Sequence, residues 1–251
     1  METISVTALD IVTSTSDHLL DAANKGAPEG TAFRANVQTK GRGRRGRDWV
    51  SPRGNLYVSI LLRPTRPMAD WPSLSLVAGL ALYEAILPFR DAKTLGLKWP
   101  NDLLFHDRKA AGLLLEVHDG AILLGCGVNL NLSPDKVEGW PPISLNDDIA
   151  ESDHLDAETL MDAITKTLPS RYNQWQAESF TALSQDWLQA SAHFGQDLAI
   201  TMQNKTVEGR FTALDPSGSL CLQDSDGVNH VITQGDVTKA RLKDQHLNNN
   251  G

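Results

Sequence analysis

Residues 41–46 read Gly-Arg-Gly-Arg-Arg-Gly, and the elements on either side of this stretch decide the fold class. The spacing matches the glycine fingerprint of dinucleotide-binding folds, which must follow a strand and open a helix. Here Phe33, Ala35 and Val37 alternate with polar residues before the loop, and an apolar, β-rich run over residues 56–62 follows it. Because a strand comes next, no helix N-terminus is available for a pyrophosphate, and a Rossmann fold is excluded.

Apolar periodicity on both sides of the loop predicts an α/β domain with a mixed sheet and helices on one side. A strand near residues 4–8 leads into a helix that begins at the hydroxyl cluster 13–16 and ends at Gly26. A second helix is expected from Ser73 to Pro88, and helices should fill residues 156–190 with a break at Pro169. Further strands are expected at 95–99, 102–105, 110–117 and 121–128, with a type I′ hairpin at Asp119-Gly120.

The pattern of the sequence changes after His193, from helical periodicity to short strands separated by turns. Turn residues recur about every ten positions, at 204–205, 216–218 and 226–227, and this spacing predicts a small β-barrel. We therefore expect two domains, 1–192 and 193–251, the second ending in a frayed polar tail over 248–251.

Composition describes an ordinary globular protein. The 251 residues are 41% hydrophobic and 22% charged, which excludes disordered, collagen-like and disulfide-scaffold classes. The two cysteines, Cys126 and Cys221, lie far apart without a metal-ligand spacing, so inert thiols in a reducing compartment are expected. No signal peptide and no apolar stretch of membrane-spanning length is present, so we expect a cytoplasmic protein without a membrane partner.

Charge is concentrated in the glycine loop. The chain carries a net charge of −8, yet residues 34–53 hold seven basic residues and one acidic residue. Glycines allow a backbone to approach a ligand closely, and arginines match carboxylate and phosphate oxygens with paired donors. A short loop in an acidic chain favours a small anionic ligand over nucleic acid. The remaining interpretation is a mobile, anion-binding loop.

Four motifs occur in an order that resembles the biotin protein ligase family. They are Gly41-Arg-Gly-Arg-Arg-Gly-Arg-Asp-Trp49, Lys98-Trp-Pro-Asn-Asp-Leu103, Asp107-Arg-Lys109 with Gly112-Leu-Leu-Leu-Glu116, and Gly125-Cys-Gly-Val-Asn129. Each is weak alone, whereas the ordered set is specific. The resemblance covers residues 1–192 through these motifs, and the C-terminal region fits the family's SH3-like β-barrel.

The resemblance implies a two-step ligase reaction. Biotin reacts with ATP, accompanied by Mg²⁺, to give biotinyl-5′-adenylate, and a lysine of a biotin carboxyl carrier protein then takes the biotin. No prosthetic group and no protein-held metal is implied. The chain starts directly at the catalytic domain, so a monofunctional ligase without DNA binding is expected. A homodimer is left open, because the family often pairs through its sheet.

The resemblance also assigns site residues. Those expected to be catalytic are Lys109, Arg44, Arg42 and Asp102, the last orienting or deprotonating the acceptor lysine. Those expected at biotin are Ser14, Thr15, Ser16, Gln38, Gly41, Arg42, Gly43, Arg44, Tyr57, Lys109, Gly112 and Leu114. Those expected at the nucleotide are Arg44, Trp49, Lys109, Gly125, Gly127 and Asn129.

Plainer interpretations stay open for several of these residues. Ser14–Ser16 can be a helix cap, Lys109 an edge charge, Trp49 and Tyr57 core packing, and Asp102 a turn residue. Arg45 and Arg47 can be solvated. At the level of function, the alternatives are a lipoate or octanoate ligase or transferase of the same superfamily and a non-enzymatic binding module. The segment 235–241 runs one residue longer than the common family ending, so no ATP role is carried over to Arg241.

Overall fold

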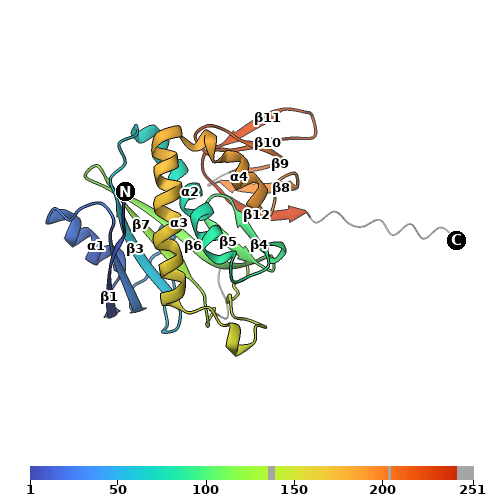
Figure 1. Cartoon of the computed structure of the whole chain (residues 1–251). Helices are drawn as coiled ribbons and strands as arrows, with labels where there is room; N and C mark the ends of the chain where they lie inside the picture. Colours follow the sequence, from blue (N-terminus) through green and yellow to red (C-terminus); the bar gives the residue numbers. More distant parts are fainter. Residues whose placement is uncertain (135–138, 203–204, 242–251) are drawn as a thin grey trace.

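The computed structural model describes residues 1–134, 139–202 and 205–241, with side chains described up to residue 238. Two sheets organise the chain (Figure 1). The first has the strand order β1-β2-β3-β7-β6-β5-β4, and the second has the order β11-β10-β9-β8-β12. Only β1 and β2 pair in parallel in the first sheet, so the predicted mixed sheet is confirmed.

Most predicted strands and helices of the first domain occur close to their expected positions. The strands of the first sheet are β1 (Ser5–Val12), β2 (Thr31–Gln38), β3 (Leu56–Leu62), β4 (Leu95–Lys98), β5 (Asp102–Phe105), β6 (Arg108–His118) and β7 (Ala121–Val128). The helices are α1 (Thr15–Asn24), α2 (Leu74–Ile86), α3 (Ala157–Glu178) and α4 (Ser184–Ala190). The hairpin prediction is confirmed, because Asp119 and Gly120 have φ of 44° and 74°, the positive pair that a type I′ turn requires.

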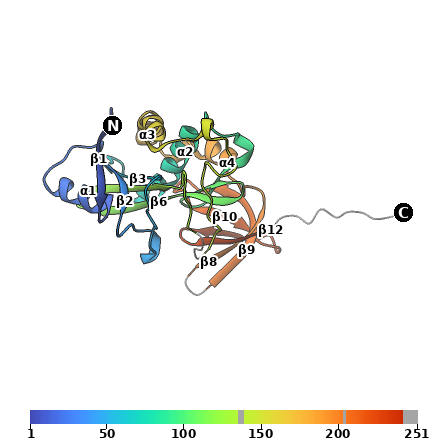
Figure 2. The ribbon, with the colours of Figure 1, turned by 90° about the horizontal axis from the view of Figure 1, so that it is seen from below.

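Side-chain alternation along β3 separates the two faces of the first sheet. Val58, Ile60 and Leu62 join the main core, in which α2, α3 and α4 bury their apolar residues. Leu61 instead packs with Leu19 of α1 in a separate cluster. The expectation of helices on one side therefore holds for α2, α3 and α4, whereas α1 lies on the opposite face (Figure 2). The part of that face which α1 does not cover is therefore free to bind a ligand.

Two local predictions about helices are wrong. Ser73 does not cap α2, because its backbone is helical and its hydroxyl donates to Asp70 O and accepts from Trp175 Nε1. Pro169 does not break the helix, because α3 continues through it with the proline buried. The break comes at Ser179, whose φ is 67°. In both places packing against neighbouring elements overrides the local signal.

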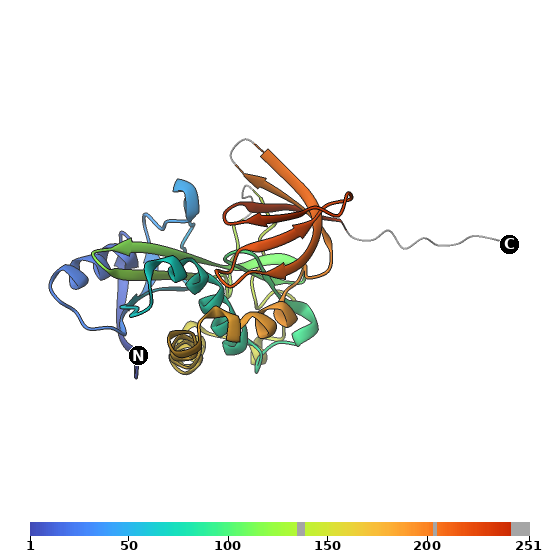
Figure 3. The same ribbon diagram turned by 90° about the horizontal axis from the view of Figure 1, so that it is seen from above.

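The second sheet is antiparallel and lies against the first (Figure 3). Its strands are β8 (Asp197–Met202), β9 (Lys205–Leu214), β10 (Leu220–Gln223), β11 (Asn229–Ile232) and β12 (Asp236–Arg241). The contact includes a hydrogen bond of 3.0 Å from Trp99 Nε1 to Gly218 O. The turns at 216–218 and 226–227 occur as predicted, whereas Asn204, the tail 248–251 and the side chain of Arg241 lie outside the described residues. No helix in the described part of the chain has the length and apolarity needed to span a bilayer.

Candidate active site

A cavity of about 560 Å³ opens on the face of the first sheet that α1 only partly covers. The glycine loop borders it on one side, and the start of β12 from the second sheet borders it on another. Its lining includes five cationic side chains and three carboxylates. In a chain of net charge −8, this local excess of positive charge marks a site for anions.

One end of the cavity is a cluster of hydroxyl groups around an amide. Gln38 Oε1 accepts from Thr15 N at 2.9 Å and from Thr15 Oγ1 at 3.0 Å. Ser59 Oγ lies 2.8 Å from Thr15 Oγ1 and 3.1 Å from Ser16 Oγ. The interpretation of Ser14 as a helix cap is confirmed, because it is the N-cap of α1 and its side chain accepts from Ser16 N. Hydroxyl hydrogens rotate to suit a partner, so this end can meet a head group with both donors and acceptors.

Ser59 is a site residue that sequence reasoning missed. It is fully buried in the middle of an otherwise apolar strand, β3, and faces the cavity. A lone serine in the run Leu56–Leu62 is the signal that could have found it, because buried polar groups need partners.

Glycines keep the floor of the cavity open, and Trp49 lies across it. Gly112 of β6 pairs with Gly127 of β7, next to the pair of Leu114 and Gly125. A Cβ on Gly127 would lie 2.5 Å from Trp49 Nε1, and a Cβ on Gly112 would lie 3.0 Å from Trp49 Cζ3. The buried Trp49 Nε1 has no hydrogen-bond partner among the described residues. A ligand acceptor near the indole would supply that partner.

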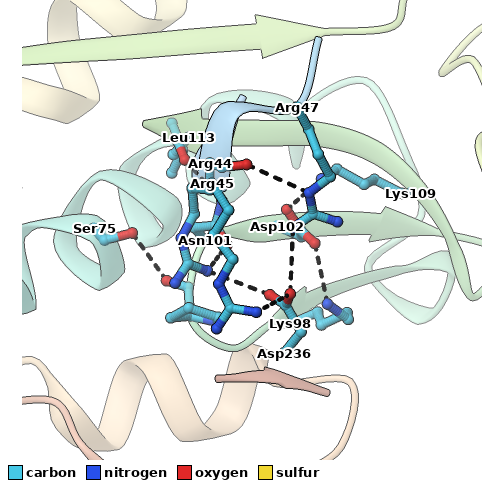
Figure 4. A network of polar contacts seen from close by, with 11 residues as sticks. Arg44, Arg45, Arg47, Ser75, Lys98, Asn101, Asp102, Lys109, Leu113 and Asp236 are labelled. Carbon is cyan, nitrogen blue, oxygen red and sulfur yellow. Dashed lines mark hydrogen bonds and ion pairs between the residues drawn. The ribbon is translucent and has the colours of Figure 1, made fainter. Parts of the chain in front are cut away.

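Lys98, Asp102 and Lys109 line the cavity and form a lysine–aspartate–lysine cluster (Figure 4). Asp102 Oδ2 is 3.1 Å from Lys98 Nζ, and Asp102 Oδ1 is 2.7 Å from Lys109 Nζ. Burial raises the pKa of Asp102, but the charges of Lys98 and Lys109 outweigh it and lower the pKa to about 2. A carboxylate paired with two lysines is a poor proton acceptor, so the arrangement favours the orienting role expected for Asp102 over the deprotonating one.

The arginines of the loop are held by carboxylates from distant elements. Arg42 pairs with Asp17 of α1 at 2.5 Å and with Glu116 of β6 at 3.3 Å. The hydrogen bond that Arg42 donates to Asp17 contributes most to raising the pKa of Arg42, against its partial burial. Arg44 donates to Asn101 Oδ1 at 2.8 Å, in the turn that leads into Asp102, the first residue of β5. These contacts tie the loop to both sides of the cavity.

Arg45 and Arg47 are exposed, as the solvated alternative requires, and each also forms an ion pair. Arg45 Nη1 is 3.0 Å and Arg47 Nη2 is 3.3 Å from Asp236 Oδ2, and Arg44 Nη1 is 3.7 Å from Asp236 Oδ1. Asp236 belongs to β12, and nothing in its local sequence distinguishes it from other strand aspartates.

Most of the predicted site residues line this one cavity, and two do not. The residues brought together are Ser14, Thr15, Ser16, Gln38, Arg42, Gly43, Arg44, Trp49, Asp102, Lys109, Gly112, Leu114, Gly125, Gly127 and Asn129. Tyr57 is buried behind the wall, where its hydroxyl donates to Pro52 O at 2.8 Å. Gly41 also lies outside the lining, and a Cβ there would sit 2.4 Å from Trp49 O, so the glycine serves the close return of the loop.

Comparison with known proteins agrees with this geometry. Residues 8–133 match the biotin/lipoate A/B protein ligase family, and residues 193–239 match the biotin protein ligase C-terminal domain. The chain is 35% identical over 217 residues to a biotin–[acetyl-CoA-carboxylase] ligase of Paracoccus denitrificans, covering 81% of this chain and 88% of the relative. It is 33% identical to the ligase of the same name from Mycobacterium tuberculosis, covering 93% of this chain and 89% of the relative.

Among solved structures, the biotin protein ligase from Aquifex aeolicus in complex with biotin and ATP superposes with a TM-score of 0.80. The identity is 26%, and the match covers 94% of this chain and 98% of that one. The chain thus belongs to the biotin/lipoate A/B protein ligase family and carries the C-terminal domain of biotin protein ligases.

Proposed function

We propose that this ligase activates biotin with ATP as biotinyl-5′-adenylate and transfers it to a lysine of a biotin carboxyl carrier protein. One observation carries the proposal. A single cavity has a hydroxyl–amide end suited to a polar ring and, beside it, a cluster of cations suited to a carboxylate and phosphates. The named relatives and the Aquifex aeolicus complex support the choice of acid and nucleotide.

The first step brings two anions together. A carboxylate oxygen of biotin attacks the α-phosphorus of ATP, the bond to the β-phosphate oxygen breaks, and pyrophosphate leaves. Lys109 lies beside Asp102 at the cavity wall, and Lys98, Arg42 and Arg44 also line the cavity. Cations fixed where negative charge gathers lower the repulsion between the reactants and stabilise the transition state.

The second step needs an unprotonated amine and little water. The neutral amine of the acceptor lysine attacks the acyl carbon of the mixed anhydride. The bond from that carbon to the phosphate oxygen breaks, AMP leaves, and the surplus proton of the amine passes to solvent. With Asp102 ionised and paired to two lysines, we propose that it positions the incoming amine and does not remove its proton. The glycine loop, held over the cavity by Arg42 and Arg44, would keep water from the adenylate.

Mg²⁺ is expected to enter with the nucleotide. Magnesium usually keeps several waters and is held by one or two carboxylates together with substrate phosphates. Asp48, which lines the cavity beside the loop arginines, would supply such a carboxylate. When bound, the ion would neutralise phosphate charge.

The domain limits complete the proposal. We infer a catalytic domain of residues 1–192 and a small β-domain of residues 193–251, whose β12 borders the cavity. The acceptor domain of the carboxylase would reach the adenylate from the open side of the cavity.

The hydroxyl end discriminates biotin from lipoate or octanoate in this proposal. Ser59, Thr15 and Gln38 form a hydrogen-bonded group that a ureido ring can join and that an alkyl chain cannot. Replacing Ser59 by alanine should raise the KM for biotin about five- to tenfold, the loss of about one hydrogen bond, with a smaller effect on kcat. Equal weakening of biotin and lipoate would contradict a role in selecting the acid.

The direct test is ATP–pyrophosphate exchange by the purified chain with Mg²⁺ and biotin, lipoate or octanoate added separately. We expect exchange with biotin alone, followed by labelling of a carrier-domain lysine. Exchange with lipoate or octanoate would assign the chain to the sister activity. A folded protein that supports no exchange with any of the acids would be a binding module.

A further inference from the structure

The side chain of Asn55 holds the backbone of a segment that leaves the first sheet. β3 and β7 pair as far as the first residue of β3 and the last residue of β7. Beyond that pair, Asn55 Oδ1 accepts from three successive backbone nitrogens, at 2.9 Å from Leu130 N, 3.0 Å from Asn131 N and 3.1 Å from Leu132 N. Asn55 Nδ2 donates to Leu132 O at 2.7 Å, so the side-chain amide takes the place of a backbone partner.

The segment that Asn55 holds goes on to border the cavity. We call its described residues, 129–134 and 139–143, the cavity segment. Lys98 Nζ lies 5.4 Å from the centre of the Trp140 ring, so the segment borders the end of the cavity that carries the lysines. The residues of the segment that line the cavity are Asn129, Pro134, Gly139, Trp140 and Pro142. The cavity segment thus faces the end where the nucleotide is proposed to bind.

Backbone hydrogen bonds fix the far end of the cavity segment. Lys109 N donates to Pro141 O at 2.7 Å, and Ile143 N donates to Lys109 O at 3.0 Å. Trp140 Nε1 also donates to Asp107 O at 2.6 Å. The far end is therefore attached beside the lysine assigned to biotin activation, whereas Asn55 attaches the near end through a side chain.

A second amide links the near end to its surroundings. Asn131 Nδ2 donates to Gly54 O at 2.7 Å, and Asn131 Oδ1 accepts from Asn146 Nδ2 at 2.7 Å. Asn146 Oδ1 in turn accepts from Leu155 N at 2.9 Å. Asn131 thereby connects the near end both to the residue before Asn55 and to the chain that follows the far end.

The burial of these groups makes the contact of Asn55 costly to lose. Asn55 is 3% exposed and Leu130 is fully buried. Without the Asn55 side chain, three successive N–H groups would lose their acceptor, and Leu130 could not turn its own to solvent. The near end would then become ordered only when a ligand binds, and the cost of ordering it would weaken that binding.

We propose that Asn55 is a positioning residue for nucleotide binding, which holds the near end of the cavity segment in place before ATP arrives. Asn55 lies outside the residues that line the cavity, so it acts through the segment and not by touching ATP. The choice of ATP as the ligand rests on the proposed function. The hydroxyl–amide end of the cavity is built from Thr15, Gln38 and Ser59, which lie outside the cavity segment, so biotin should not sense Asn55.

A role in the fold alone makes a different prediction. If Asn55 only braces the fold, its loss should lower the free energy of unfolding and leave the affinities of the folded protein for both substrates unchanged. If Asn55 positions the cavity segment, its loss should weaken ATP binding and leave biotin binding unchanged. The difference between the two substrates therefore separates the two roles.

The test is calorimetric titration of the full chain with ATP and Mg²⁺ and, in a separate experiment, with biotin, so that no turnover occurs. Asn55→Ala should bind ATP about tenfold more weakly than the wild type and biotin within about twofold of it. The control is Ser73→Ala, which removes a buried hydroxyl with two hydrogen bonds outside the cavity lining and should bind both substrates as the wild type does. Unchanged ATP affinity in Asn55→Ala, or equal weakening of ATP and biotin, overturns the proposal.

A milder variant keeps the test valid if Asn55→Ala folds poorly. Asn131 is exposed, and Asn131→Ala keeps the backbone nitrogen that Asn55 accepts from while removing the links to Gly54 and Asn146. Asn131→Ala should weaken ATP binding about threefold, the loss of about one hydrogen bond, and should have little further effect in the Asn55→Ala background. Unchanged ATP affinity in Asn131→Ala, or an equal effect in both backgrounds, overturns the proposal.

Hydrogen exchange tests the contact itself without any ligand. The amides of residues 130–132 should exchange faster in Asn55→Ala than in the wild type, and equal protection overturns the proposal. A wild-type chain that binds neither ATP nor biotin would refute the proposed function and the choice of ligand together. Wild-type binding of both, with unchanged ATP affinity in the variants, would refute this inference alone.

Discussion

Replacing Lys109 by alanine should slow adenylate formation by about 10²- to 10³-fold, the usual effect of removing one fixed donor at a centre of developing charge. Lys109 Nζ lies 2.7 Å from Asp102 Oδ1 and 5.3 Å from the centre of the Trp49 ring. Lys109 thus lies between Asp102 and the indole ring of Trp49, above the glycines of the cavity floor. We expect the carboxylate of biotin and the α-phosphate to meet there. The amine is about one-quarter exposed, so it can reach a bound ligand.

The fold should survive this change. Asp102 keeps Lys98 at 3.1 Å, so the buried carboxylate is not left unpaired. We expect Lys109→Ala to lower the free energy of unfolding by about 1 kcal/mol, which lowers the Tm by roughly 2–4 °C for a chain of this size. The assay is single-turnover formation of biotinyl-adenylate, with the exposed Lys93→Ala as the control for loss of a positive charge. Wild-type adenylate formation by Lys109→Ala would refute the role assigned to this lysine.

Two further predictions concern the glycine floor and acid stability. Gly127→Ala should displace Trp49 from the floor of the cavity, because the new Cβ would lie 2.5 Å from the indole, and it should raise the KM for ATP about tenfold. The control is Gly79→Ala, whose Cβ would have its nearest contact at 3.6 Å and which should leave the KM unchanged. Burial and the charge of a nearby lysine lower the pKa of His193 from 6.5 to about 4. As the pH falls, the unfolded state therefore takes up a proton before the folded state does. Urea titrations should show that the free energy of unfolding falls by about 3 kcal/mol between pH 6.5 and pH 4. His193→Gln should remove this fall, and Asp102, with its pKa lowered from 3.8 to about 2, should govern a further loss only below pH 4. A wild-type pH dependence in His193→Gln, or an unchanged KM in Gly127→Ala, would contradict these assignments.

Local signals predicted the strands well where burial agrees with them. The run over 56–62 is apolar at six of its seven positions and β3 occupies it fully, because a central strand is buried on both faces. The Asp119-Gly120 turn has the two positive φ angles that its sequence indicates. In contrast, Ser73 and Pro169 carry strong local signals that buried contacts with neighbouring elements override.

The site was predictable only in part, for a similar reason. Motif residues such as Gly112, Gly127 and Lys109 are close to one another along two paired strands, so their order in the sequence implies their proximity in space. Asp236 lies about 190 positions from the arginines it contacts, and only the packing of the second sheet against the first brings them together. No periodicity or motif in one sequence reports such a contact.

The carboxylates around the cavity balance the positive charge that the proposed reaction requires. A site that must hold a carboxylate against a triphosphate needs dense positive charge, and that charge repels itself when no ligand is bound. In the described structure the cations are each paired: Arg42 with Asp17 and Glu116, the lysines with Asp102, and the remaining arginines with Asp236. Asp102 is buried and strongly acidic, so it should stay in place through the reaction. Three partly buried carboxylates at the rim of the cavity, Asp17, Glu116 and Asp236, can instead yield to phosphate oxygens. If so, rising salt should weaken the rim pairs before the buried cluster, and trypsin should cleave the loop faster at high salt without biotin or nucleotide while the melting temperature changes little. Loop cleavage that is independent of salt would indicate that packing, and not these ion pairs, holds the loop.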